Sequence, residues 1–229
     1  MHETMKTVAM ISQKGGSGKT TVAVHLAVCA ELAGKRSAII DLDPQASAKS
    51  WHDNRQEKSP TVISAQASRL AELMETAKTH GAALVIIDTA PHSETASLAA
   101  ARAADLILIP CRPGILDIRA IATSADLAAL SKTPAMAVLT ACPYRGTLPD
   151  EATAAIKTYG LPVAPVRITQ RSAFIHSLTA SQAVLEYERK GRGAEEIKQL
   201  YKFTLSQLHK PTITQLHMAA PQQFKERTA

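Results

Sequence analysis

The chain has 229 residues, of which 45% are hydrophobic and 20% charged, and its formal net charge at pH 7 is +6. This composition can bury a core and excludes a chain that is mainly disordered. No apolar run reaches the roughly 18 residues of a membrane-spanning helix, and the three cysteines form no CxxC pair, which argues against a disulfide scaffold or structural zinc site. We expect a soluble, cytoplasmic, globular protein, whose positive charge permits a polyanionic partner.

Short apolar runs alternate with longer amphipathic segments along the chain. The expected strands are 8–11, 37–40, 84–87, 106–109, 136–139 and 163–168, and the expected helices are 21–32, 69–80, 94–103, 117–130, 150–159 and 195–208. Strands that are apolar throughout, with helices between them, predict a mostly parallel, doubly wound α/β sheet with helices on both faces. We expect one domain over residues 1–210, followed by a polar, loosely ordered tail over 211–229.

A glycine-rich turn follows the first expected strand and opens the first expected helix. Its glycines let backbone N–H groups point at a phosphate, and the helix adds the positive end of its dipole. Lys19 would reach the β- and γ-phosphates, and the Thr20 hydroxyl would ligate Mg²⁺. The turn therefore predicts a P-loop for ATP and Mg²⁺, formed by Lys14, Gly15, Gly16, Ser17, Gly18, Lys19, Thr20 and Thr21.

Carboxylates follow two of the other expected strands. Asp41 and Asp43 come at the end of the second strand, where alternation puts both on one side, facing the phosphates. Asp88 follows four apolar residues, a Walker B pattern that delivers a carboxylate to the Mg²⁺ shell. The predicted metal set is Thr20, Asp41, Asp43 and Asp88. For Asp41 and Asp43, a cap at the strand-to-helix junction remains the alternative.

Lys14 lies five residues before the P-loop lysine, and Gln13 stands where the general P-loop has glycine. With the sequence DLDPQ at 41–45 and the D-x-x-P pattern at 88–91, the chain resembles the ParA/MinD family of deviant Walker A ATPases. Within that family it resembles the small ParA-type DNA-partition ATPases, from about residue 7 to about residue 208.

The resemblance implies a homodimer that encloses two ATP molecules. Lys14 would then cross to the nucleotide of the other subunit, and Asp43 would be tied to hydrolysis, so Lys14, Asp43 and Lys19 are the expected catalytic residues. For Lys14 alone, the alternative is a solvated loop lysine. The segment 109–117 resembles a family stretch that would help form the dimer face, and 168–174 resembles a family segment near the adenine pocket.

Basic residues gather near the end of the expected domain. Eight basic and four acidic residues lie between 167 and 210, so this stretch carries +4 of the net +6. Such clustering is typical of contact with the phosphate backbone of DNA without sequence preference. The alternative is a solvated helical face. The residues expected to bind DNA are Arg167, Arg189, Lys190, Arg192, Lys198 and Lys202.

Together these features predict a Mg²⁺-dependent ATPase that dimerises on ATP, binds non-specific DNA in that state and is nucleoid-associated. The resemblance implies plasmid or chromosome partition with a ParB-like or ParG-like centromere-binding adaptor. We expect neither a helix-turn-helix domain before Lys6 nor a membrane-binding helix in 211–229. A positioning ATPase for protein cargo or conjugation machinery, a metabolic P-loop phosphotransferase and a filament-forming protein remain alternatives.

Overall fold

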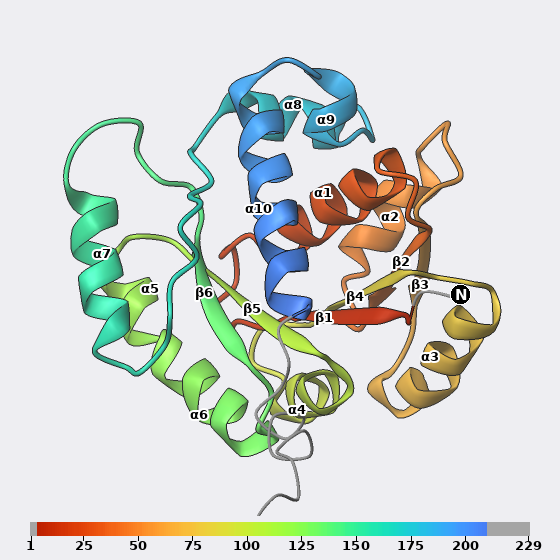
Figure 1. The fold of residues 1–229 in the computed structure, drawn as a ribbon, viewed down its shortest axis with the longest axis horizontal. Coiled ribbons are helices and arrows are strands. Elements are labelled where there is room, and N and C mark those ends of the chain that lie inside the picture. The colour runs from red at the N-terminus through yellow and green to blue at the C-terminus, as the bar shows by residue number, and fades with distance from the viewer. Residues whose placement is uncertain (1–3, 210–229) are drawn as a thin grey trace, which may run out of the picture.

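Six strands form one sheet in the computed structural model, which describes residues 4–209; the expected tail lies outside the described residues. The sheet order is β3-β2-β4-β1-β5-β6, and all of its pairings are parallel (Figure 1). This confirms the predicted doubly wound α/β fold. The strands are β1 (Lys6–Met10), β2 (Ser37–Asp41), β3 (Thr61–Ser64), β4 (Leu84–Asp88), β5 (Leu106–Cys111) and β6 (Ala135–Leu139).

Helices cover both faces of this sheet and build a separate apolar core on each. One face carries α1 (Lys19–Leu32), α2 (Ser47–Asp53), α8 (Ser172–Thr179), α9 (Val184–Tyr187) and α10 (Arg192–Leu208). The other carries α3 (Leu70–Thr79), α4 (Glu94–Ala103), α5 (Ile115–Arg119), α6 (Ile121–Ser131) and α7 (Leu148–Lys157), with the 3-10 turn Ala67–Arg69 before α3. None of the helices between residues 4 and 209 combines the length and apolarity needed to cross a bilayer.

The strands serve both cores because successive side chains point to opposite faces. Val8 and Met10 of β1 join the core under α1 and α10, whereas Ala9 and Ile11 join the core under the opposite helices. This double burial explains why the central positions of the inner strands are apolar on both faces.

The strand expected over 163–168 was wrong. The segment runs beside β6 but makes only isolated parallel bridges, Ala137 with Val163 and Cys142 with Thr169. The N–H of Ala164 donates to the Ala137 carbonyl at 2.8 Å, and the next donor to β6 is Ile168, to the Leu139 carbonyl at 2.9 Å. Four residues of this segment therefore advance against two of β6, which breaks the ladder.

Other differences concern short elements. The segment expected as one helix over 117–130 is divided into α5 and α6 at Ala120. Sequence reasoning also missed β3, α2, α8 and α9, which have four to eight residues each. Segments of this length are too short to show a helical period, and their stability comes from packing against the rest of the fold.

A histidine lies inside the core between α1 and α8. His25 is fully buried, and its ring stacks on Phe174 with the ring centroids 5.2 Å apart. Neither ring nitrogen has a hydrogen-bond partner among the described residues. Burial lowers the pKa of His25 to about 3, against the opposing charge of Glu186. The ring is therefore neutral in the folded protein over most of the pH range.

This histidine predicts a loss of stability in acid. The unfolded chain binds a proton at His25 near pH 6.5, whereas the folded chain does so only near pH 3, so the free energy of unfolding falls as the pH drops through this interval. Between pH 7 and pH 5 the free energy of unfolding should fall by about 2 kcal/mol more in the wild type than in His25→Gln. Urea unfolding at both pH values measures this. The exposed His80 is the control: if His80→Gln removes as much of the loss, the prediction is contradicted.

Candidate functional site

The turn between β1 and α1 is closed by glycine conformations and by a contact to β6. Gly16 and Gly18 have φ angles of 72° and 97°, a region that glycine enters without steric cost. The Thr140 hydroxyl, directly after β6, donates a 2.7 Å hydrogen bond to the Ser17 carbonyl. Gly18 is the N-cap of α1, so the loop ends at a helix N-terminus, where anions are stabilised.

The loop curls around the side chain of Lys19. Its ammonium donates to the carbonyls of Ser12 at 3.1 Å and Lys14 at 3.3 Å, and the side chain is buried. Burial lowers the pKa of Lys19, while Asp88 and Asp43 oppose this shift. The lysine is therefore fixed inside the turn with carboxylates nearby.

The strand order places the predicted carboxylates beside this turn. In the sheet register Asp88 lies opposite Met10 of β1 on one side and Asp41 of β2 on the other. Thr20 donates a 2.6 Å hydrogen bond to Asp88 Oδ2, and burial raises the pKa of Asp88 to about 7. The P-loop hydroxyl and two acids that are distant in sequence thus share one edge of the sheet.

Asp41 and Asp43 are not equivalent. β2 ends at Asp41, whose buried carboxylate accepts N–H groups of Asp43 at 3.1 Å, Ala48 at 3.0 Å and Lys49 at 3.2 Å. Burial raises the pKa of Asp41, and these bonds oppose the shift. Asp41 therefore supports the start of α2, as in the alternative left open by the sequence. Asp43 is less buried, and its carboxylate accepts a local hydrogen bond from the Gln45 N–H.

The residues present fit a nucleotide phosphate with Mg²⁺. Gln13 Nε2, Ser17 Oγ and Asp88 Oδ1 are buried and have no hydrogen-bond partner among the described residues. Buried polar atoms of this kind are costly unless a ligand or water satisfies them. Mg²⁺ is commonly held by one or two protein oxygens together with substrate phosphates and waters. Within residues 4–209 no group of three or more His, Cys, Asp or Glu could hold a metal alone.

The second lysine of the turn has a different environment. Lys14 forms a 2.8 Å ion pair with Asp117 of α5, and its side chain is 38% exposed. Asp117 belongs to the segment that the resemblance assigns to the dimer face. The two lysines of one loop therefore point to different partners: Lys19 lies inside the turn, and Lys14 lies at its surface.

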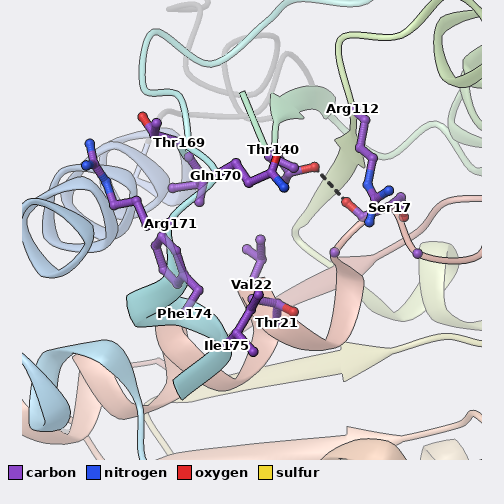
Figure 2. A pocket seen from close by; sticks show the side chains of 14 residues that line it. Ser17, Thr21, Val22, Arg112, Thr140, Thr169, Gln170, Arg171, Phe174 and Ile175 are labelled. Atoms are coloured by element: carbon purple, nitrogen blue, oxygen red, sulfur yellow. Dashed lines mark hydrogen bonds between the residues drawn. The ribbon is translucent and has the colours of Figure 1, made fainter. Parts of the chain in front are cut away.

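A cavity of about 310 Å³ extends from the P-loop to the chain around α8. Figure 2 shows Phe174 and Ile175 of α8 beside Thr21 and Val22 of α1, with Arg112 reaching toward Ser17. The segment expected near the adenine pocket therefore lies at this cavity. Its lining residues are Gly16, Ser17, Gly18, Thr21, Val22, Arg112, Thr140, Ala141, Ile168, Thr169, Gln170, Arg171, Phe174 and Ile175.

Glu196 of α10 holds one wall of this cavity. Its carboxylate accepts hydrogen bonds from the N–H and hydroxyl of Thr169, at 3.0 and 2.8 Å, and from Nε and Nη2 of Arg171, at 3.2 and 2.6 Å. The loop over residues 169–171 is thus fastened to α10 by a single side chain. Sequence reasoning missed this role because the contact joins residues 25 to 27 positions apart.

Thr140 was also missed, although a signal was present: it is the first polar residue after the apolar run of β6. The carboxyl ends of parallel strands are where ligand contacts gather, so a polar side chain at this position is a candidate.

The six residues expected to bind DNA lie in different surroundings. Lys198 and Lys202 are exposed one turn apart on α10, and Lys198 Nζ lies 3.4 Å from the Arg189 carbonyl. Arg192 donates to the Tyr144 hydroxyl at 2.7 Å, and Arg167 is paired with Asp150. Lys190 is exposed beside Arg189. The structure therefore brings Arg189, Lys198 and Lys202 together and ties Arg167 to an acid.

The Glu196 contacts predict a role in ligand affinity. Glu196→Ala frees the loop that lines the cavity, so nucleotide affinity should fall about 10-fold while P-loop contacts stay in place. Fluorescence titration with labelled ADP measures the affinity. Glu195→Ala is a matched control, because its exposed carboxylate accepts a hydrogen bond from the Gln199 amide of the same helix. Equal affinities for the two variants would refute the role of Glu196.

Comparisons with known proteins agree with this geometry. Residues 8–185 match the family described as the CobQ/CobB/MinD/ParA nucleotide binding domain. The chain is 31% identical over 201 residues to Maintenance of carboxysome distribution protein A of Gloeobacter kilaueensis, covering 86% of this chain and 91% of that protein. It is 29% identical over 135 residues to the chromosome-partitioning ATPase Soj of Thermus thermophilus, covering 46% and 54%.

A solved structure shares the fold across nearly the whole chain. It is cobyrinic acid a,c-diamide synthase from Mycobacterium smegmatis with bound ATP analog and magnesium, with a TM-score of 0.72 and 20% identity, covering 90% of this chain and 96% of that one. At this identity the likeness concerns the fold alone. From its P-loop, the register of its strand-end acids and the match over residues 8–185, the chain belongs to the CobQ/CobB/MinD/ParA family of nucleotide-binding domains.

Proposed function

We propose that this protein is a Mg²⁺-dependent ATPase that forms a homodimer around two ATP molecules. The observation that carries the proposal is the separation of the two P-loop lysines. Lys19 is buried inside the turn and serves the nucleotide of its own chain, whereas Lys14 is held at the surface by Asp117. Lys14 is therefore the lysine available to the nucleotide of a second copy.

The pairing of Lys14 with Asp117 suits such an exchange. The Lys14 side chain is 38% exposed, so water can solvate its ammonium group during an exchange of partners. A polyphosphate carries more negative charge than one carboxylate and forms stronger, charge-assisted bonds with an ammonium group. Lys14 can thus exchange Asp117 for the phosphates of a nucleotide.

Hydrolysis needs a water molecule beside the γ-phosphate and neutralisation of the charge that develops there. A bound Mg²⁺ would supply positive charge that offsets part of the negative charge of the phosphates. Thr20 and Asp88 are the residues that would hold it. Asp43 has the freer carboxylate and would orient the water, while Asp41 fixes the chain around it through α2.

We propose that the ATP dimer binds DNA without sequence preference through the exposed cations of α10 and the turn before it. Dimerisation would place two such surfaces in one particle, and the same dependence on ATP would give release after hydrolysis. DNA partition with a centromere-binding adaptor, in a nucleoid-associated cytoplasmic protein, is the cellular role we favour, and it agrees with the similarity to Soj.

A second candidate is the positioning of a protein cargo by the same ATP cycle. The observation that favours it is the 31% identity to a carboxysome-distribution protein over 91% of that protein's length. The two candidates differ in the partner that stimulates hydrolysis, a DNA-bound adaptor or a protein on the cargo surface. Adding each partner type to the ATPase assay separates them.

Replacing Lys19 and replacing Lys14 should remove different properties of the protein. Lys19→Ala loses the group inside the turn, so nucleotide affinity should fall at least 10-fold. Lys14→Ala should keep nucleotide affinity within about threefold but lose ATP-dependent dimerisation and hydrolysis, with a rate loss of roughly 10³-fold. Calorimetry, light scattering and phosphate release measure the three properties. Equal loss of nucleotide affinity in both variants would overturn the proposal, as would a wild-type protein that stays monomeric with ATP.

DNA binding should depend on the cations of α10. Replacing Lys198 and Lys202 with Ala should weaken ATP-dependent DNA retention and lower the slope of log affinity against log salt by about 2, since each phosphate contact contributes about 0.9. Replacing Lys78 and Lys157, which are exposed on helices of the opposite face, is the matched control. Filter binding between 50 and 200 mM salt measures both pairs. If both double variants change DNA retention and the salt slope by the same amount, Lys198 and Lys202 do not form the DNA-binding surface.

A further inference from the structure

A third basic residue lies at the P-loop besides Lys14 and Lys19. Arg112 follows β5 directly, and its side chain extends over the turn between β1 and α1. Its Nη2 atom lies 3.6 Å from the position that a Cβ would take on Gly16. Figure 2 shows the guanidinium beside Ser17, on the open side of the loop.

The charge of this arginine is not balanced by the protein. Two arginines line the cavity, and Arg171 is paired with Glu196 at 2.6 Å. The guanidinium group of Arg112 makes no ion pair or hydrogen bond within residues 4–209, and only the backbone carbonyl of this residue accepts a bond, from the Cys111 thiol at 3.2 Å. Lys14 is paired with Asp117, and Lys19 is bonded to loop carbonyls. In the part of the chain that the structure describes, Arg112 is thus the cation at this cavity without a partner.

The surroundings of Arg112 favour an anion. The loop beneath it ends at the N-terminus of α1, where backbone N–H groups and the helix dipole attract negative charge. The planar guanidinium presents two parallel donors that match the oxygens of a phosphate. Arg112 lies at the end of the cavity that Gly16 and Ser17 line, away from Phe174 and Ile175, so its reach is to phosphates rather than to a base.

We infer that Arg112 is a phosphate-binding residue for the nucleotide held by its own chain. Lys19 approaches the phosphates from inside the turn, and Arg112 closes over them from the open side. This inference rests on the proposed function, because it requires that the cavity holds a nucleotide. Arg112 would then contact the nucleotide of its own chain, whereas Lys14 serves the nucleotide of the second copy.

The test measures ADP affinity, since no ATP-dependent dimer then contributes. Arg112→Ala should raise the Kd for ADP about 10-fold, because a charge-assisted hydrogen bond is lost, and Arg112→Lys should restore part of the affinity. Displacement of labelled ADP by inorganic pyrophosphate should weaken about 10-fold as well. Arg119→Ala is the matched control, an exposed arginine of α5 that does not line the cavity; its Kd should match that of the wild type.

Several outcomes would overturn the inference. Unchanged ADP affinity in Arg112→Ala would do so, and loss of ATP-dependent dimerisation alone would instead assign the arginine to the partner subunit. Weaker ADP binding with unchanged pyrophosphate affinity would place it at the base or ribose. A wild-type protein that binds no ADP would refute the proposed function itself, and this is distinguishable from a failure of Arg112 alone.

Discussion

The site depends on one constraint, the parallel register that sets β4 between β1 and β2. That register puts Asp88 beside both Met10 and Asp41, so the end of β4 lies directly under the turn that follows β1. The 2.6 Å hydrogen bond from Thr20 to Asp88 then ties the first turn of α1 to this strand. A slip of one residue in β4 would turn Asp88 to the opposite face and leave Thr20 without its acceptor.

This arrangement is built at a cost to the stability of the protein without a ligand. Asp88 is fully buried, with its pKa raised to about 7, and one of its oxygens has no partner among the described residues. Ser17 and Gln13 each add a buried polar atom without a partner. A ligand that satisfies these atoms binds the folded state selectively, and it therefore stabilises the fold that holds it. Local violations of the usual burial rules gather where proteins bind ligands.

A feature of the site could be predicted from the sequence where its residues are close together in the chain, and could not where they are far apart. The placement of the glycine-rich turn, Asp41 and Asp88 at one edge of the sheet was predictable, because each directly follows an apolar strand and the carboxyl ends of parallel strands meet at one edge. Thr140 and Glu196 act through contacts to residues 123 and 25–27 positions away, which no local pattern encodes. The strand expected over 163–168 was wrong because an apolar run gives no sign of the two extra residues between Ala164 and Ile168 that break the pairing with β6.

Glu196 has a further consequence for the proposed cycle. Its carboxylate holds the cavity wall over residues 169–171, and its backbone belongs to α10, the helix that carries Lys198 and Lys202. Glu196 of α10 bonds Thr169 and Arg171 directly, so a nucleotide that moves this wall also acts on α10. Coupling between two sites needs an element that both of them bias. The loop with its four hydrogen bonds to Glu196 is such an element, because a shift of Thr169 or Arg171 must be followed by α10 or must break those bonds.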